Sequence, residues 1–153
     1  MIEPHWDLIL EAAKKHNVDP KLVAAIVRKE SGGQPWAMRY EPRWSYLFKT
    51  AEFAHRLYIT EITEIHLQSF SYGLMQVMGS VCRELGFLGY LPQVLNPEIG
   101  LDLGCKKLRD LFYKYQDEKD VISAYNQGSP LKRGGIYLNQ QYVDGVLKFK
   151  AEL

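Results

Sequence analysis

The spacing of apolar residues along the chain predicts a series of amphipathic helices. Within residues 5–16, Trp6, Ile9, Leu10 and Ala13 recur at i, i+3, i+4 and i+7, which places them on one helical face. Similar spacing and cap residues predict further helices over residues 19–30, from Gly79 through Phe87, from Asn96 to about Tyr115, and over 117–126 and 139–152.

Two stretches lack this helical period. Residues 31–50, with Gly, Pro and several aromatic residues, read as a loop, and residues 131–138 read as a basic, Gly-containing loop. Residues 51–66 begin with helix formers, but residues 58–65 are ambiguous between helix and strand. The whole pattern predicts a mainly α fold with little or no sheet.

Length and composition narrow the class of protein. A chain of 153 residues predicts one domain, residues 1–153, with one core. The net charge of +1, with both signs interspersed, argues against a nucleic-acid surface. No apolar run is long enough to span a membrane, and no signal peptide is visible at the N-terminus. Ten Tyr, six Phe and three Trp suit a groove that stacks on flat ligands such as sugar rings.

The two cysteines, Cys82 and Cys105, fall in separate predicted helices. Two thiols without nearby His or further Cys make a poor metal site, and no calcium-loop spacing is present. The sequence therefore predicts neither a metal nor a cofactor. Buried thiols are the favoured interpretation; a disulfide, which needs neighbouring helices, remains open.

Glu30 is the strongest candidate for chemistry. The predicted helix 19–30 starts at the N-cap Asp19 and stops at Gly32 and Gly33, with Glu30 in its last turn. Glu30 follows Ile26 by four residues and so lies on the apolar face of the helix. Apolar surroundings and the negative end of the helix dipole both predict a raised pKa, which suits a general acid. The alternative is a last-turn glutamate that turns into solvent.

Three further segments carry candidate residues. In Ser71-Tyr-Gly73-Leu-Met75-Gln76-Val77, Gly73 allows a tight turn, and Gln76 needs a partner if it is buried. That partner is either a sugar group or the protein backbone. The segment Ala124-Tyr125-Asn126 lies at a helix end, where Asn126 has the alternative of a plain C-cap. In Asn139-Gln-Gln-Tyr142-Val143, Tyr142 has the alternative of an ordinary core residue.

These segments, in this order in a mainly α chain, resemble the catalytic domain of the soluble lytic transglycosylases (SLT), which belong to the goose-type lysozyme-like superfamily. The resemblance covers about residues 5–148, and Asn96-Pro-Glu-Ile-Gly100 resembles the start of the helix before the tyrosine motif. It implies a lysozyme-like fold with a substrate groove. It also implies a lytic transglycosylase, a lyase that cleaves the β-1,4 bond between N-acetylmuramic acid and N-acetylglucosamine in peptidoglycan and forms a 1,6-anhydro product.

The resemblance also implies residue roles. Glu30 would protonate the leaving oxygen and then deprotonate the C6 hydroxyl. Tyr125 and Tyr142 would lie near this carboxyl group, and Asn126 and Gln76 would hydrogen-bond the substrate. Ser31 and Ser71 would bind the sugar or orient Glu30, and Gly73 and Met75 would contact the sugar beside the scissile bond.

The stretch between Glu30 and Ser71 is long for the family, and residues 36–70 resemble an insertion that forms a lid or groove wall. It contains Glu41, Glu52, Glu61 and Glu64. If one of them activated water at roughly 6.5–9.5 Å from Glu30, the protein would be a hydrolase like goose-type lysozymes. The alternative interpretation is that all four glutamates are ordinary charged residues on the surface of helices.

A third class is a non-catalytic peptidoglycan-binding module of a phage or secretion apparatus. In every case the expected partner is the peptidoglycan glycan strand, and the expected location is the cell wall: periplasmic, extracellular or phage-associated. The lack of heptads predicts a monomer.

Overall fold

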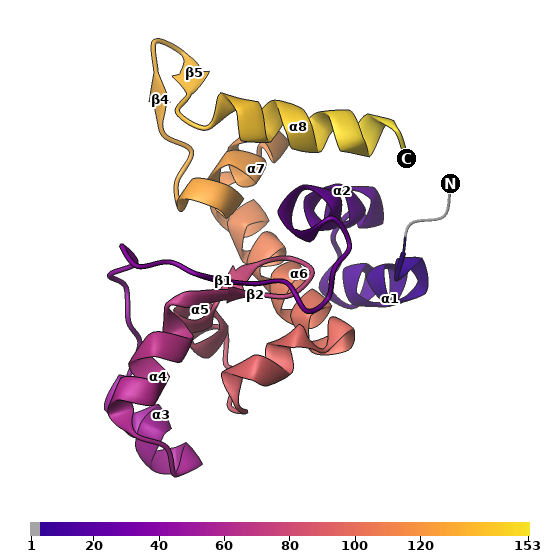
Figure 1. The fold of residues 1–153 in the computed structure, drawn as a ribbon. Coiled ribbons are helices and arrows are strands. Elements are labelled where there is room, and N and C mark those ends of the chain that lie inside the picture. The colour runs from indigo at the N-terminus through magenta and orange to yellow at the C-terminus, as the bar shows by residue number, and fades with distance from the viewer. Residues whose placement is uncertain (1–3) are drawn as a thin grey trace. The chain divides into compact units, whose positions relative to one another are not determined.

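The computed structural model describes residues 4–153 (Figure 1). These residues form two compact units. The terminal unit contains the described residues up to Gly33 together with Cys105–Leu153. The central unit is Gln34–Gly104. The long helix α6, Pro97–Tyr115, begins in the central unit and ends in the terminal one.

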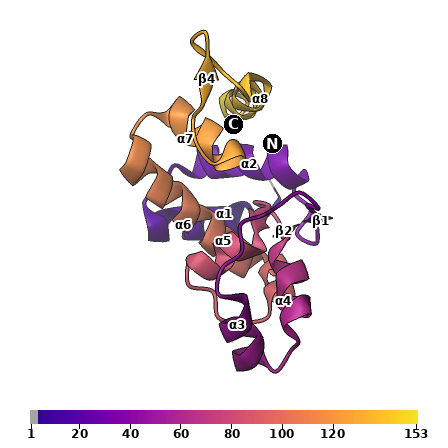
Figure 2. The ribbon, with the colours of Figure 1, turned by 90° about the vertical axis from the view of Figure 1, so that its left-hand side faces the viewer.

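The terminal unit is built from helices. Besides the end of α6, it contains α1 (Trp6–His16), α2 (Pro20–Ser31), α7 (Glu118–Gln127) and α8 (Gln140–Ala151). Helix α2 packs against both α1 and α8, and α8 also packs against α7 (Figures 1 and 2). Several side chains of this core have no solvent exposure: Ile9, Leu22, Ile26, Leu108, Ile122 and Val146.

The helix ends in this unit follow the predicted cap residues. The Asp19 side chain accepts a hydrogen bond from the Lys21 amide at 2.9 Å, and Asp117 accepts one from the Asp120 amide at 3.1 Å. Helices α2 and α7 end at Gly32 and Gly128, whose φ angles of 61° and 91° lie in the left-handed region. The sequence predictions for these helices are confirmed within a residue or two.

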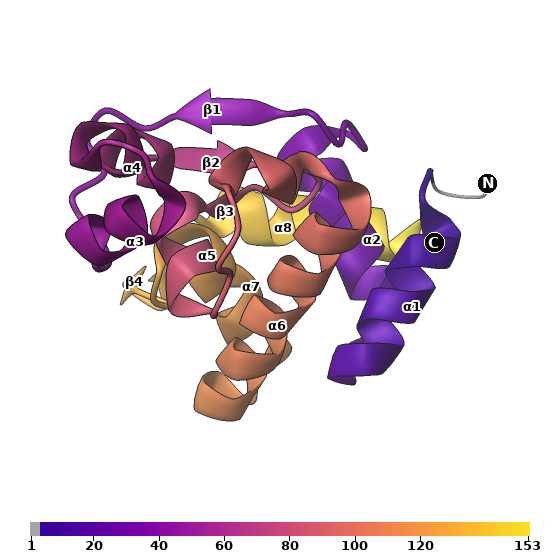
Figure 3. The ribbon, with the colours of Figure 1, turned by 90° about the horizontal axis from the view of Figure 1, so that it is seen from below.

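The central unit contains a small antiparallel sheet in the order β1-β2-β3, formed by Met38–Tyr40, Phe70–Tyr72 and Val77–Met78 (Figure 3). The sheet contacts α4 (Glu61–Gln68), α5 (Gly79–Glu84) and the 3-10 helix η1 (Leu91–Leu95), and α3 (Thr50–Leu57) packs against α4. The prediction of a loop over 31–50 was therefore wrong at β1, because Met38–Tyr40 gains its ladder from β2, thirty residues on, which no local pattern reveals.

The ambiguous stretch 58–65 is helical. Tyr58, with φ of 56°, ends α3, and the Thr60 side chain then caps α4 by accepting from the Thr63 amide at 3.2 Å. Helix α5 ends at Glu84 rather than running to Phe87, because the chain turns at Gly86, whose φ is 101°.

The predicted loop 131–138 is a β-hairpin of β4 (Lys132–Arg133) and β5 (Ile136–Tyr137). Gly134 and Gly135 form its two-residue turn with φ of 59° and 78°. Positive φ at both central residues characterises one of the two common two-residue hairpin turns, and glycine adopts it without strain. The Gly-Gly pair was thus a readable hairpin signal.

The long segment 36–70 is anchored along its length. The Trp44 indole donates to the Ser80 hydroxyl at 2.9 Å, and the Tyr46 hydroxyl donates to Glu84 at 2.7 Å. The Gln68 amide binds both the backbone N–H and the carbonyl of Phe48, each at 2.8 Å. The segment is therefore an integral part of the central unit.

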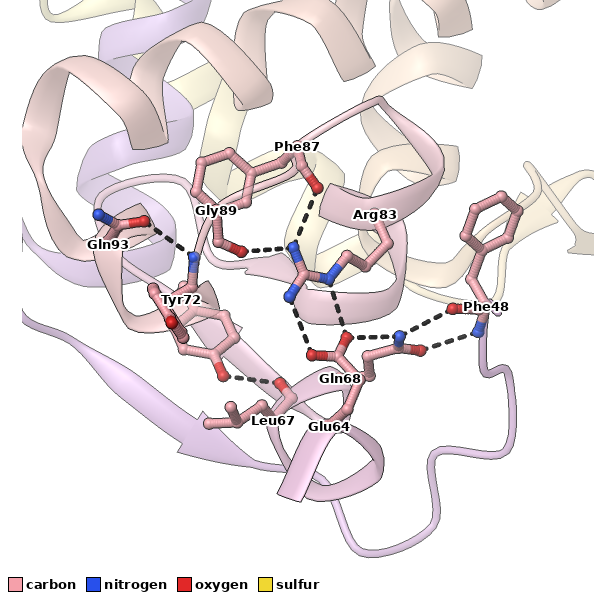
Figure 4. Close-up of polar contacts among 10 residues, drawn as sticks. Phe48, Glu64, Leu67, Gln68, Tyr72, Arg83, Phe87, Gly89 and Gln93 are labelled. Carbon is pink, nitrogen blue, oxygen red and sulfur yellow. Dashed lines mark hydrogen bonds and ion pairs between the residues drawn. The ribbon is translucent and has the colours of Figure 1, made fainter. Parts of the chain in front are cut away.

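A buried ion pair lies at the centre of this anchoring (Figure 4). The Arg83 guanidinium donates to both carboxylate oxygens of Glu64, at 2.8 and 2.9 Å, and both side chains have no solvent exposure. Arg83 also donates to the carbonyls of Phe87 and Gly89, and Gln68 donates to Glu64 at 2.7 Å. Such complete pairing is what makes a buried charge tolerable.

Cys82 and Cys105 are buried thiols that no disulfide joins, as the sequence favoured. Among residues 4–153, none of the helices combines the length and apolar character needed to cross a membrane.

Candidate active site

Glu30 lies half-buried in the last turn of α2, directly after the buried run Leu22–Val27. The Tyr142 hydroxyl donates a hydrogen bond to Glu30 Oε1 at 2.7 Å. Tyr142 lies in the first turn of α8, 112 residues further along the chain. The packing of α8 on α2 therefore brings together two residues that the sequence singled out separately.

Tyr142 is a neutral donor at physiological pH. Burial raises the pKa of Tyr142 far above its ordinary value, and the nearby Glu30 carboxylate and the hydrogen bond to it raise it further. The phenol therefore keeps its proton and fixes the orientation of the Glu30 carboxyl group.

Tyr125 supplies a second aromatic group on this side. It is buried in the last turns of α7, and its own phenol contributes to the raised pKa of Tyr142. The Lys107 ammonium lies 3.9 Å from the centroid of the Tyr125 ring and donates to the Tyr125 carbonyl at 2.9 Å. This cation–π contact and hydrogen bond hold the end of α7 against α6.

Asn126 is exposed at the end of α7, and its amide is held from one side. Asn139 Nδ2 donates to Asn126 Oδ1 at 2.9 Å and to the Ser123 carbonyl at 3.0 Å. The Ser123 hydroxyl completes the network by donating to Asn139 Oδ1 at 2.7 Å. Asn126 therefore presents its Nδ2 group as a donor.

Ser31 closes the end of α2. Its hydroxyl donates to the Val27 carbonyl at 3.1 Å and accepts from the Gly33 amide at 3.2 Å. These contacts shape the chain that leaves Glu30.

A second group of candidate residues lies in the turn between β2 and β3 of the central unit. Gly73 has φ of 72°, and its amide donates to the Ala37 carbonyl at 2.7 Å. A Cβ atom at this position would lie only 3.0 Å from the Val94 carbonyl oxygen, which is too close. Both the positive φ and the close approach require glycine here. Met75 is fully buried, with its side chain against Gly104.

Ser71, in β2, and Gln76, in the turn, are hydrogen-bonded to each other. The Ser71 hydroxyl donates to Gln76 Oε1 at 2.8 Å, and Gln76 Nε2 donates to the carbonyls of Ala37 and Gly73 at 3.0 and 2.9 Å. The sequence left a sugar group or the protein backbone as the partner of Gln76, and the Gln76 Nε2 group binds the backbone. Its φ of 49°, unusual for a residue with a side chain, is held in place by these bonds.

A family model, the Transglycosylase SLT domain, matches residues 7–140 of the chain. The chain belongs to the SLT domain family. A curated relative, "Transglycosylase" of Enterobacteria phage PRD1, is 25% identical over 124 residues, which are 81% of this chain and 35% of that protein. This SLT chain thus spans about a third of the length of the phage relative it matches.

A solved structure, an inactive mutant of the lytic transglycosylase Slt from Pseudomonas aeruginosa, superposes on this SLT chain with a TM-score of 0.66 at 18% identity. The match covers 95% of this chain and 23% of that one. At this identity the likeness concerns the fold, and the mainly α, lysozyme-like fold predicted from the sequence is confirmed.

The four glutamates that the sequence offered as a second carboxylate lie in different environments in the SLT domain. Glu64 is not a surface charge, because Arg83 and Gln68 bind it in the buried cluster. Glu41 pairs with Arg39 at 3.1 Å, and Glu61 accepts from Thr50 at 3.3 Å. Glu52 is exposed on α3, as expected of a surface charge.

Sequence reasoning missed two residues that support the candidate site, Lys107 and Asn139. Asn139 stands at an N-cap position, where Asn normally caps its own helix, but here its side chain binds α7 instead. Lys107 read as one more cation on a long helix. Within residues 4–153 the structure shows no cluster of three or more metal-ligating side chains.

Proposed function

We propose that this SLT domain is a peptidoglycan lytic transglycosylase with Glu30 as its one acid–base residue. The observation that carries the proposal is the 2.7 Å hydrogen bond from Tyr142 to Glu30, which holds a half-buried carboxyl group at a helix end. A family whose model is named for transglycosylases supports the same reaction, as do the names of both relatives. One of them is described as an inactive mutant with a Glu-to-Gln substitution.

In the first step, protonated Glu30 gives its proton to the glycosidic oxygen between N-acetylmuramic acid and N-acetylglucosamine. The C1–O bond breaks, the N-acetylglucosamine side leaves as an alcohol, and the acetamido oxygen of the muramic residue bonds to C1. Charge that develops at C1 is thereby taken up by the substrate itself, so no second carboxylate is needed.

In the second step, the Glu30 carboxylate removes the proton of the C6 hydroxyl. The C6 oxygen bonds to C1, the bond from the acetamido oxygen breaks, and the 1,6-anhydro product forms. Glu30 ends the cycle protonated, as it began. No water is consumed, so the reaction is a lyase reaction rather than a hydrolysis.

The surrounding side chains support this proton transfer. Because Tyr142 keeps its proton, it stays a donor to Oε1 through both steps and helps to orient the carboxyl group. Tyr125 is buried, is held by Lys107, and contributes to the raised pKa that keeps Tyr142 protonated. Asn126, held by Asn139, offers Nδ2 to an acetamido carbonyl or a hydroxyl of the glycan.

We assign the turn residues of the central unit a different kind of role. Gly73 offers backbone where a side chain would not fit, while Ser71 and Gln76 fix the conformation of the turn. The fully buried side chain of Met75 packs this turn against Gly104 of α6. In this scheme the substrate contacts of the central unit come from its backbone, and the place of action is the bacterial cell wall.

The test is mass spectrometry of fragments released from purified peptidoglycan. We expect muropeptides lighter by one water than reducing muropeptides, and for Glu30→Gln a rate lower by about 100-fold or more, the range of general acid–base catalysis. The control is Glu11→Gln, which makes the same change at an exposed position of α1 and should keep full activity.

Reducing muropeptides would instead identify a hydrolase. Binding without any release by the unmodified protein would identify a wall-binding module. Full activity of Glu30→Gln would remove Glu30 from the mechanism.

A further inference from the structure

Lys150 joins the ends of three helices in the terminal unit. It lies in the last turn of α8, and its ammonium group binds carboxylates at the starts of α2 and α7. Lys150 Nζ lies 3.1 Å from Asp19 Oδ2, and 3.0 and 2.9 Å from the two carboxylate oxygens of Glu118. Figure 1 shows α8 next to both α2 and α7, in agreement with their packing contacts. One side chain therefore fastens three helix ends together.

Both carboxylates are well placed to hold this ammonium group. Asp19 is the N-cap of α2: its Oδ1 accepts from the Lys21 amide, and its Oδ2 faces Lys150. Glu118 is the first residue of α7. The helix dipole favours carboxylates at a helix start and an ammonium group at a helix end. Burial alone would lower the pKa of Lys150, but its hydrogen bonds to Glu118 and Asp19, with the charges of these carboxylates, raise it above its ordinary value. The side chain therefore stays charged at physiological pH.

The opposite ends of the same three helices carry the candidate active site. Glu30, Tyr125 and Tyr142 lie 11, 7 and 8 residues, respectively, from the residue of their own helix that takes part in this ion-pair cluster. At 1.5 Å per residue, the cluster is about 10–16 Å from them along the helices. Because a helix is a stiff element over this length, a contact that fixes one end restricts the position of side chains at the other.

A second ion pair links α8 to α2. Arg28 Nη1 lies 2.9 Å from Glu152 Oε2, and the Arg28 guanidinium lies 5.1 Å from the centroid of the Phe149 ring. The Glu152 side chain is 48% exposed, whereas that of Lys150 is 25% exposed, so solvent screens the Arg28 pair more strongly. Lys150 is also bound by two carboxylates from two helices, which makes it the stronger anchor of α8.

We propose that Lys150 is a positioning residue for Glu30, because it holds α8 in the register that brings the Tyr142 hydroxyl to the Glu30 carboxyl group. This inference rests on the proposed function. A slide of α8 by the rise of one residue, about 1.5 Å, is enough to break the hydrogen bond of 2.7 Å between them, since O–H···O bonds extend to about 3.0 Å. Lys150 thus acts through Tyr142 and not on the reacting atoms.

The alternative is that Lys150 stabilises the fold and has no particular effect on Glu30. A double-mutant cycle separates the two roles, because residues that act through one contact have effects that do not add. The four proteins are the unmodified domain, Lys150→Met, Tyr142→Phe and the double variant. The assay is the initial rate of release of anhydromuropeptides from purified peptidoglycan at several substrate concentrations, which yields kcat and KM separately.

We expect Lys150→Met to lower kcat by about threefold, a factor within the range that partly exposed ion pairs contribute, and to leave KM unchanged. The loss should be smaller than that caused by Tyr142→Phe, which removes the hydroxyl altogether. In the Tyr142→Phe background, Lys150→Met should cause no further loss, because no hydroxyl remains to be positioned.

Three further variants sharpen the test. Lys150→Arg keeps donors for both carboxylates and should restore kcat. Glu118→Gln removes the partner charge at the start of α7 and should lower kcat, again only where Tyr142 is present. Lys148→Met, at an exposed lysine of the same helix, is the matched control and should have the kcat of the unmodified domain. Urea unfolding of each variant shows that it is folded under the assay conditions.

A Lys150→Met variant with the kcat of Lys148→Met would overturn the inference, while anhydro products from both would keep the proposed function. An equal fractional loss of kcat with and without the Tyr142 hydroxyl would also overturn it and assign Lys150 to the stability of the fold. If Lys150→Met does not fold, the same cycle with Glu118→Gln decides. No anhydro product from the unmodified domain would overturn the proposed function and this inference with it.

Discussion

Replacing Tyr142 by Phe tests the candidate active site most directly. The change removes one hydroxyl, and with it the 2.7 Å hydrogen bond to Glu30 Oε1, while the aromatic ring remains. A hydrogen bond to a charged group is worth about 1.5–3 kcal/mol. Because Tyr142 and Glu30 are both half-buried, water can take the place of the hydroxyl, and the lower part of that range, about 1.5–2 kcal/mol, applies.

At 1.36 kcal/mol for each factor of ten, this energy predicts a kcat lower by about 10- to 30-fold. KM should change little, since Tyr142 acts on Glu30 and not on the sugar. The assay is the initial rate of release of anhydromuropeptides from peptidoglycan at several substrate concentrations. Tyr113→Phe, at a tyrosine of α6 that is 76% exposed, is the control and should match the unmodified domain. A Tyr142→Phe variant within twofold of that control in kcat would refute the assignment of Tyr142 to Glu30.

Three further predictions concern stability. Arg83→Met leaves Glu64 as a buried carboxylate without its ion pair and should cost about 3–5 kcal/mol in urea unfolding at neutral pH; a loss below about 1 kcal/mol would contradict it. Gly73→Ala forces a side chain into a φ of 72° beside a carbonyl and should cost about 2 kcal/mol, measured in the same way; unchanged stability would contradict the close approach. Burial, with the hydrogen bond to Asp120, raises the pKa of Tyr137 from 10.0 to about 12, so its stabilisation is present below pH 10 and is lost as the pH rises toward 12. Between pH 8 and pH 11 the Tm should therefore fall less for Tyr137→Phe than for the unmodified domain. An identical fall in Tm for both proteins would contradict the raised pKa of Tyr137.

The helices of the terminal unit were predictable because their signals are local. Asp19 and Asp117 cap helices that start where the apolar period starts, and Gly32 and Gly128 end them. Each signal involves residues within one helical turn of one another, so a single sequence contains all of the information.

Glu64 shows where such reasoning stops. In Glu-Ile-Thr-Glu-Ile it reads as one of two charges on a surface helix, yet it has no solvent exposure. A carboxylate can be buried only with a partner, and its partner Arg83 lies 19 residues away on another helix. No periodicity within α4 indicates that contact. The strand β1 was missed for the same reason, because its pairing with β2 spans the whole of α3 and α4.

The candidate site combines both cases. The sequence predicted that Glu30 and Tyr142 lie on two separate helices. The structure adds the hydrogen bond between them, which depends on the packing of α8 against α2. The structure also changes the roles expected for Ser71 and Gln76. Ser71 and Gln76 were candidates for reading the substrate, but their polar groups bind each other and the backbone.

A residue type that fits a functional pattern therefore fits a structural one equally well, and the hydrogen-bond partners decide between them. By this criterion Asn126 and Gln76, two amides of the same chemistry, differ. The Gln76 amide bonds through both its oxygen and its nitrogen, whereas among residues 4–153 the exposed Asn126 amide is held through its oxygen alone. An amide oriented from one side, with its donor turned outward, is suited to bind a ligand. An amide bonded through both ends is suited to hold a backbone in an uncommon conformation, which at Gln76 is a φ of 49°.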